Sequence, residues 1–299
     1  MFTLKKQIAA IGILAAMAFS ATAQAHTTVL AKNTPDEYNS RNELEGTTGV
    51  NHFSLPHGCD GNPVEAQSIV FPNGENAVAV RKDNGEIIDN LSVHITGNAI
   101  MAPKPAKDET TFKKTETLSG PVPLFENHGE STEDTRAFKF TKANNLKADD
   151  LALIPWRATF PTFNSDSCAM ALTVNIGIAN YCTKSRDDAG RADIWIGRLT
   201  TLFDDPNVVS VDFWPFLRVV RDLQNNPIDE SCGDGFEINV TPSDGSMDEF
   251  LPIAGFWPSD KSEEKDDENE HDDDDSDDED SEDEEEDDNR RRGGRRDKD

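Results

Sequence analysis

Short segments in which apolar and polar residues alternate with a period of two most constrain the fold of this chain. Successive side chains of a strand point to opposite faces of a sheet, so this alternation is typical of half-buried strands. The pattern recurs, between turn sequences rich in Pro, Asn, Asp and Gly, in VEAQSIVF, LSVHIT, RAFKFTK, LALIPWRATF, AMALTVNIGIAN, RADIWIGRL, VVSVDFWPFL and FEINV. Long amphipathic helical patterns are scarce. We therefore predict an all-β fold, a β-sandwich of many short antiparallel strands with long loops.

Three segments allow more specific predictions. A strand over LSVHIT (residues 91–96) would turn His94 towards solvent. The proline-bearing segment from Pro103 to Pro123 is irregular and is predicted to be a long surface loop. FLRVVRDLQNN (residues 216–226) fits either a short helix or a strand that leads into a turn.

The N-terminal residues have the pattern of a secretory signal peptide. Lys5 and Lys6 precede an apolar stretch that is too short to span a bilayer, and Ala23-Gln24-Ala25 is an A-x-A cleavage site. We predict removal of residues 1–25, which makes His26 the first residue of the mature protein. No later segment approaches the roughly 18 apolar residues of a membrane span. The predicted location is therefore secreted, periplasmic or on the outer cell surface of a Gram-negative bacterium.

The C-terminal residues differ in composition from the rest of the chain. Residues 260–299 contain 24 Asp and Glu against 8 Lys and Arg, a net charge of −16 out of −29 for the whole chain. Because this run has almost no apolar residues, we predict a disordered acidic tail with a basic end after a single β-rich domain over residues 26–259. The acidic balance excludes nucleic acid as a partner and favours cations, including metal ions.

The chain has four cysteines: Cys59, Cys168, Cys182 and Cys232. An even number in an oxidising compartment indicates two disulfides, and three pairings are possible. If the sequence between Cys168 and Cys182 is one straight strand, its ends are too far apart for a disulfide, which needs Cα atoms within about 7 Å. A hairpin near Gly177 would allow that pairing. We favour a pairing of each with another cysteine.

Histidines supply the candidate metal ligands. A free His26 would offer its α-amino group and its ring Nδ1 as a chelate, and amine and imidazole nitrogens suit Cu²⁺. His57 precedes Gly58 and Cys59, so a disulfide at Cys59 would hold its ring in place. His128 lies in a turn-like segment between two glutamates. His94 is the remaining candidate.

Several motifs of the common enzyme classes are absent from the sequence, which contains no GxSxG, no HExxH and no Gly-rich phosphate loop. We therefore predict that the protein is not an enzyme. Loop carboxylates allow a further cofactor, calcium, which takes several oxygen ligands. The candidate ligands are Asp229, Glu230 and Asp234.

Three segments resemble a known family. AHTTVL at the predicted mature start, NHFSLPHGC, and VEAQSIVFPNG from Val64 to Gly74 are similar to the MopE/CorA family, the copper-binding surface proteins of methane-oxidising bacteria. The similarity covers about residues 26–74, and the run from His-Gly-Cys to Gln-Ser-x-Val-Phe-Pro-Asn is moderately specific. The first segment also resembles YcnI-like periplasmic copper proteins, which use an N-terminal histidine.

The resemblance implies a β-rich fold and a copper ion held by two imidazoles and a tryptophan oxidised to kynurenine. His57 matches the first imidazole, and His128 is the best candidate for the second, with His94 behind it. The family tryptophan stands two residues before the first histidine, where this chain has Leu55. Leucine offers no ligand, so the site needs a replacement such as His26, or it is weaker or lost.

These observations together predict a secreted or surface-associated copper-binding protein for copper uptake or sequestration, without catalysis. Its partners would be metal ions and the outer cell surface or another surface protein. One alternative is a surface structural or Ca²⁺-binding protein without a tight copper site. The other is a copper-dependent oxidase with an N-terminal histidine brace, which the presence of only two tyrosines makes less favoured.

Overall fold

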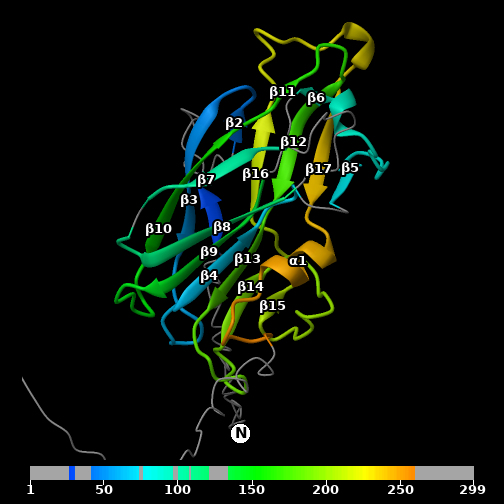
Figure 1. Cartoon of the computed structure of the whole chain (residues 1–299). Coiled ribbons are helices and arrows are strands. Elements are labelled where there is room, and N and C mark those ends of the chain that lie inside the picture. Colours follow the sequence, from blue (N-terminus) through cyan, green and yellow to red (C-terminus); the bar gives the residue numbers. More distant parts are fainter. Residues whose placement is uncertain are drawn as a thin grey trace, which may run out of the picture. The chain divides into compact units, whose positions relative to one another are not determined.

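The structure is a computed structural model that describes residues 27–30, 42–73, 77–96, 100–107, 109–120 and 134–259. Its strands form four sheets with the orders β1-β3-β10-β7, β11-β6, β2-β16-β12-β17-β5 and β15-β14-β13-β4-β9-β8 (Figure 1). The signal peptide, His26, His128 and the acidic tail lie outside the described residues. The all-β prediction is confirmed, with three parallel pairs, β12–β17, β2–β16 and β14–β15, among mostly antiparallel ones.

The elements have the following bounds. The strands are β1 (Thr28–Leu30), β2 (Asn42–Leu44), β3 (Thr48–Leu55), β4 (Ala66–Val70), β5 (Val78–Arg81), β6 (Ile95–Thr96), β7 (Ala102–Pro105), β8 (Phe112–Gly120), β9 (Asp134–Ala143), β10 (Ala152–Thr159), β11 (Thr162–Phe163), β12 (Ala169–Asn175), β13 (Gly177–Tyr181), β14 (Ala192–Trp195), β15 (Val209–Ser210), β16 (Phe216–Val220) and β17 (Phe236–Thr241). The helical elements are the 3-10 turns η1 (Leu91–Val93) and η2 (Glu230–Cys232) and the helix α1 (Asp244–Phe250).

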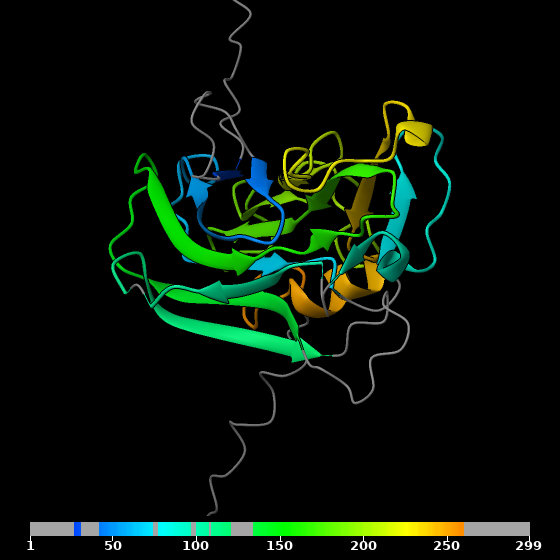
Figure 2. The same cartoon turned by 90° about the horizontal axis from the view of Figure 1, so that it is seen from above.

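Two sheet layers stack as a β-sandwich (Figure 2), and aromatic side chains hold them together. Phe53 of β3 stacks on Trp156 of β10, with ring centres 4.9 Å apart. Phe71, which follows β4, lies 5.8 Å from Trp156 and 5.0 Å from Phe138 of β9. All four side chains are fully buried, and such aromatic pairs add to the free energy gained by burial alone. The four-stranded sheet therefore packs against the six-stranded sheet.

The other face of the six-stranded sheet is covered by α1 and the residues after it. Met247 and Leu251 are fully buried there, and the Leu251 carbonyl accepts hydrogen bonds from Ser68 Oγ at 2.6 Å and Tyr181 Oη at 2.8 Å. Both faces of the sheet are thus covered, which explains why every residue of β4 and of β13 is buried.

Strands β12 and β13 form one extended run that passes from the five-stranded to the six-stranded sheet at Ile176. No hairpin turns at Gly177, so the two cysteines that flank this run are far apart. The disulfides are Cys59–Cys182 and Cys168–Cys232. This confirms both the number of disulfides and the prediction that Cys168 does not pair with Cys182.

Two of the specific predictions about local structure are wrong. The segment from Pro103 to Pro123 is not one loop, because it contains β7 and the nine-residue edge strand β8. Most side chains of β8 are exposed on both faces, so its sequence shows no alternation. LSVHIT is not one strand either, since the Asn90 side chain caps η1 and only Ile95 and Thr96 form β6. Residues 216–220 form β16, the strand alternative for FLRVV.

The fold buries the carboxyl group of Asp134, at the start of β9, without giving both of its oxygens a hydrogen bond. Its Oδ1 accepts a hydrogen bond from the Thr135 N–H at 2.7 Å, whereas its Oδ2 has no hydrogen-bond partner among the described residues. Burial raises the pKa of Asp134 to about 6, although Arg136 and Lys104 oppose this shift. The folded chain therefore binds this proton more tightly than the unfolded chain does.

We predict that Asp134→Asn stabilises the protein at neutral pH. Between about pH 4 and pH 6 the folded state holds more protons than the unfolded state, so stability falls as pH rises through this window. The amide avoids the cost of ionisation and keeps an acceptor for Thr135. The free energy of unfolding at pH 7.5 should rise by on the order of 2 kcal/mol, and the difference should shrink towards pH 4. Urea titrations at several pH values measure this, and equal stability at pH 7.5 would contradict it.

Candidate metal centre

Of the four histidines predicted as metal ligands, the structure describes His57 and His94 and places them at opposite ends of the run β12–β13. His57 lies two residues before Cys59, which is bonded to Cys182 just after β13. His94 bonds to Ser167, which lies just before β12. At about 3.3 Å per residue this run separates its ends by roughly 40 Å. His57 and His94 cannot hold the same metal ion.

His94 has the contacts of a structural histidine. Its Nδ1 lies 3.0 Å from Ser167 Oγ, and its ring meets the edge of Phe236 at 5.3 Å between ring centres. The Arg81 guanidinium lies 4.1 Å from the centre of the Phe236 ring. Burial lowers the pKa of His94, and the charge of Arg81 adds to this effect. The prediction that His94 points to solvent is therefore wrong, because η1 replaces the expected strand.

His57 follows the end of β3 and is held by a short turn and a disulfide. Cys59 and Asn62 form a two-residue hairpin bridge, and the two residues between them, Asp60 and Gly61, have φ values of 45° and 85°. Positive φ at both positions is typical of a type I′ turn, which Asp-Gly favours. The Cys59 N–H donates to Cys182 Sγ at 3.1 Å. These contacts fix the backbone next to His57.

A backbone hydrogen bond sets the tautomer of His57. Its Nδ1 lies 2.5 Å from the carbonyl oxygen of Gly58, and a carbonyl oxygen can only accept. Nδ1 is therefore the donor in this bond, which leaves Nε2 as the ring nitrogen that points to other partners. Histidines that bind metals commonly donate from their other ring nitrogen to a carbonyl or carboxylate in this way. His57 thus has one imidazole nitrogen that can accept a metal ion.

His57 is one of the residues that line a pocket of about 200 Å³ beside the disulfide. Its lining residues are His57, Gly58, Cys59, Asp60, Ala189, Gly190, Ala192, Asp193, Trp195 and Asn207. Burial raises the pKa of Asp193 to about 6, although the positive charge of His57 and a hydrogen bond from the Trp195 indole lower it. An imidazole and a partly buried carboxylate from distant parts of the sequence therefore meet at this pocket.

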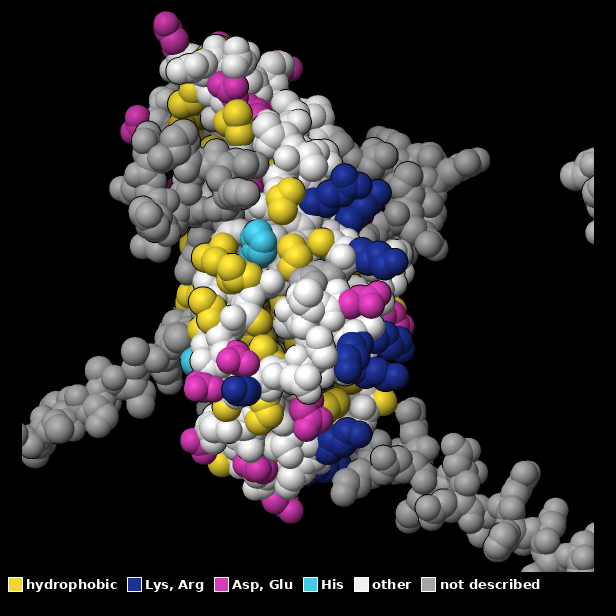
Figure 3. Space-filling model, turned by 90° about the vertical axis from the view of Figure 1, so that its left-hand side faces the viewer, with side chains coloured by type: hydrophobic (Ala, Val, Ile, Leu, Met, Phe, Trp, Pro, Cys, Tyr) yellow, Lys and Arg dark blue, Asp and Glu magenta, His cyan; other side chains and the backbone are white. Residues whose placement is uncertain are grey.

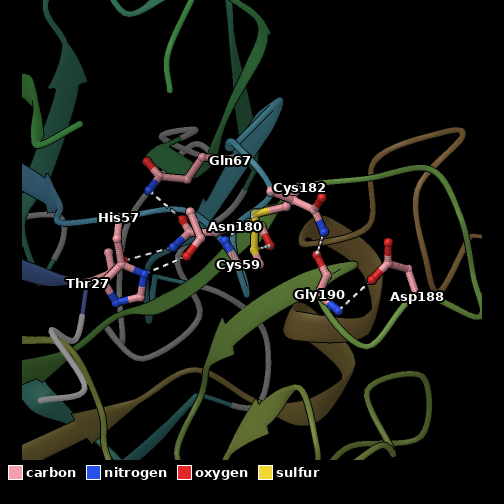
Figure 4. The surroundings of a disulfide bond; sticks show 10 residues. Thr27, His57, Cys59, Gln67, Asn180, Cys182, Asp188 and Gly190 are labelled. Carbon is pink, nitrogen blue, oxygen red and sulfur yellow. Dashed lines mark hydrogen bonds between the residues drawn. A yellow bond between two sulfur atoms is a disulfide. The ribbon is translucent and has the colours of Figure 1, made fainter. Parts of the chain in front are cut away.

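A row of polar residues crosses the sheet beside the pocket. Gln67 of β4, Asn180 of β13 and Asp193 of β14 lie opposite one another in register. The Gln67 Nε2 donates to Asn180 Oδ1 at 2.8 Å, and the Asn180 Nδ2 donates to Thr27 Oγ1 at 2.8 Å. Gln67, Asn180 and Thr27 are at most 1% exposed. In Figure 4 Thr27 and His57 lie on the same side of the Cys59–Cys182 disulfide.

The pairing of β1 with β3 places the start of the described chain near His57. Thr28 lies opposite Ser54, and the same antiparallel register sets Thr27 beside Leu55, two residues before His57. The structure therefore places Thr27, the first described residue, close to the end of β3 that leads to His57.

The sequence analysis did not find Asp193, Trp195 or Asn207 as pocket residues. Asp193 lies in RADIWIGRL, which was correctly predicted as a strand, but alternation alone does not show that Asp193 faces His57. The calcium candidates Asp229 and Glu230 belong to the η2 turn, where Asp229 accepts from the Ser231 N–H. In the described part of the chain no group of three or more His, Cys, Asp or Glu side chains could hold a metal ion.

The outward face of the four-stranded sheet exposes several apolar side chains. Leu30, Val50 and Leu153 are 41%, 49% and 43% exposed. In the register, His52 lies between Leu30 and Pro155. Figure 3 shows hydrophobic side chains gathered around a histidine on this side of the molecule, next to a line of Lys and Arg. Within the described ranges, no helix is long and apolar enough to cross a membrane.

Comparisons with known proteins do not indicate a function for this pocket. No family model matches the chain, and no curated protein matches it. Among solved structures, the chain is similar to an uncharacterised protein from Nocardia farcinica that has an immunoglobulin-like fold. That match has 10% sequence identity and a TM-score of 0.29, and it covers 66% of this chain and 97% of the other. The function is therefore inferred from the pocket itself.

We predict that the double variant Cys59→Ala, Cys182→Ala loses both stability and the fixed position of His57. This disulfide closes a loop with a sequence separation of 123, so its removal should cost about 4 to 5 kcal/mol by the loss of loop-closure entropy in the unfolded state. The control is Cys168→Ala, Cys232→Ala, which removes a comparable constraint at the far end of β12–β13. NMR should show altered ring resonances of His57 only in the first variant, and unchanged resonances there would contradict the prediction.

Proposed function

We propose that this protein binds copper outside the cytoplasm, for uptake or sequestration and without catalysis, at a site built on His57 and the N-terminal His26. One observation supports this site above the others. The β1–β3 register and the bond between Thr27 and Asn180 hold Thr27, the residue that follows His26 in the sequence, near the end of β3 that leads to His57.

The chemistry of these groups suits copper. Cleavage after Ala25 would free the α-amino group of His26, which together with its own ring Nδ1 forms a chelate. The Nε2 of His57 would add a third nitrogen. Affinity of nitrogen ligands for divalent first-row metals rises to a maximum at Cu²⁺, and imidazole suits copper. His128 stays a predicted ligand, and His94 is left out because of its distance from His57.

The disulfides support an oxidising compartment. All four cysteines are paired, and disulfides persist mainly in the periplasm, at cell surfaces and in secreted proteins. The chelate at His26 would exist only after cleavage, so the same compartment would supply both the disulfide that holds His57 and the free amine. This agrees with the pattern of the signal peptide in the sequence.

A second candidate is a surface structural protein that binds other surface components. The exposed apolar residues Leu30, Val50 and Leu153 on the outward face of the four-stranded sheet favour it, since such patches on a soluble surface often mark contacts with partners. This candidate needs no copper, so a failure to bind copper tightly would favour it over the first.

The test is a copper titration of the mature chain, His26 to Asp299, against a competing chelator. Excess Mg²⁺ should be present to occupy the carboxylates of the tail. We predict one tight copper site that His57→Ala weakens strongly. One glycine added before His26 should weaken it as well, because it moves the amine away from the ring. His94→Ala is the matched control and should bind copper as the wild-type protein does.

The other outcomes separate the alternatives. Loss of binding in His128→Ala would place His128 in the site. Loss in His94→Ala but not in His57→Ala would contradict the site proposed here. If the wild-type protein binds copper no better than at micromolar concentration, the copper function fails.

A further inference from the structure

We infer that the outer edge of strand β8 is an interaction surface at which a second copy of this chain pairs, antiparallel and centred on Thr115. This surface is formed by the exposed middle of β8, residues 113–117, and by its pairing with β9. It is independent of the proposed copper site.

The free edge of β8 offers a row of unpaired backbone groups. β8 is the last strand of the six-stranded sheet, and among the described residues no strand pairs with its other side. Residues 113–117 are all exposed. Long exposed edges are templates for another strand, and proteins usually shorten or cover them. An edge strand of nine residues is therefore a candidate surface for pairing with another chain.

The hydrogen bonds of β9 determine which residues of β8 face outward. The Phe71 N–H donates to the Arg136 carbonyl at 2.9 Å, in register with the β4–β9 pairs. Backbone groups alternate in direction along a strand, so even-numbered residues of this part of β9 bond to β4 and odd-numbered ones to β8. Even-numbered residues of β8 lie opposite those odd-numbered ones. The backbone groups of Lys113, Thr115 and Thr117 therefore point to the free edge.

An antiparallel pair centred on Thr115 suits both the hydrogen bonds and the charges of this edge. It sets Thr115 opposite Thr115 of the second copy and Lys113 opposite Thr117, so the three pairs can exchange about six backbone hydrogen bonds. Between them, Lys114 lies opposite Glu116 of the second copy, twice by symmetry. Side chains are closest in such non-hydrogen-bonded pairs, and opposite charges there are stabilising.

Other registers near the middle of β8 do not match in this way. A centre at Lys114 sets two ammonium groups opposite each other, and a centre at Glu116 sets two carboxylates opposite each other. A centre between two residues turns outward-facing groups towards groups that already bond to β9. Of the registers centred on residues 114–116, only the one at Thr115 pairs unlike charges.

The same charges favour a second copy over an unrelated strand. Lysines on an edge normally discourage pairing, because a partner strand must then bury or neutralise them. A second β8 supplies the carboxylate of Glu116 at the required position. Within its own sheet Glu116 lies opposite Lys139 of β9, so Lys114 of the second copy would lie on its other side. The edge is therefore complementary to itself.

The first experiment is analytical ultracentrifugation of the mature chain at up to about 0.3 mM, where a weak dimer is populated. Salt at about 0.15 M screens the repulsion between the acidic chains. We expect a concentration-dependent dimer. Lys114→Glu should weaken it by more than about tenfold, because two like-charged pairs replace two unlike ones. Lys113→Glu is the matched control, since it changes the charge equally but faces Thr117, and it should dimerise as the wild-type protein does.

Charge exchange and cross-linking test the register. Lys114→Glu combined with Glu116→Lys in one chain should restore the dimer, and a mixture of the two single variants should form heterodimers. Thr115→Cys should give an intermolecular disulfide under mild oxidation, because opposite Cα atoms about 5.5 Å apart are within its reach. The native cysteines are all paired. Thr117→Cys should not cross-link, because two copies of this position lie about 13 Å apart along the strands.

Three results would overturn the inference. The first is a wild-type protein that stays monomeric at the highest concentration. The second is a dimer that Lys114→Glu leaves unchanged or that Lys113→Glu weakens equally. The third is cross-linking of Thr117→Cys but not of Thr115→Cys. Circular dichroism checks the fold of each variant, which should hold because the substituted side chains are exposed. Copper binding is measured separately, so either proposal can fail without the other.

Discussion

The extended run from Ala169 to Tyr181 is the element on which the rest of the structure depends. Its first half pairs with β16 and β17, and its second half pairs with β4 and β14, so it joins the two largest sheets. A disulfide fixes the chain at each end, through Cys168 and Cys182. Covalent links at both ends restrict the unfolded chain and hold distant loops against the sheets. His57 of the candidate metal centre lies in one of those loops, next to Cys59.

Strands with one buried and one exposed face could be predicted from the sequence. In β10 the buried residues Ala152, Ile154, Trp156 and Ala158 alternate with more exposed ones. The edge strand β8 escaped prediction because it has no buried face that would impose alternation beyond Phe112. LSVHIT alternates like a strand, yet the Asn90 side chain offers the backbone N–H of Ser92 a local acceptor that stabilises η1 instead.

Only some residues of the candidate site could be predicted from the sequence. The order His-Gly-Cys indicated a histidine held by a disulfide, and the predicted cleavage site indicated a chelating His26. Asp193 is 136 residues from His57, and only the pairing of β13 with β14 and the Cys59–Cys182 disulfide bring the two together. No local pattern in one sequence encodes such a contact. For the same reason, His94 was a reasonable candidate until the length of the β12–β13 run separated it from His57.

The position of Thr27 connects folding to the chemistry proposed for the N-terminus. A terminal residue normally gains little from order, yet Thr27 is buried and bonded to Asn180 within the polar row that includes Gln67 and Asp193. A buried polar row of this kind lowers the free energy only when its members bond to one another, so Thr27 is required to complete it. An ordered residue at this point reduces the entropy that a metal ion would have to remove from the α-amine and ring of the preceding histidine. In the function proposed here, the ordered Thr27 would prepare the chelate and cleavage would complete it.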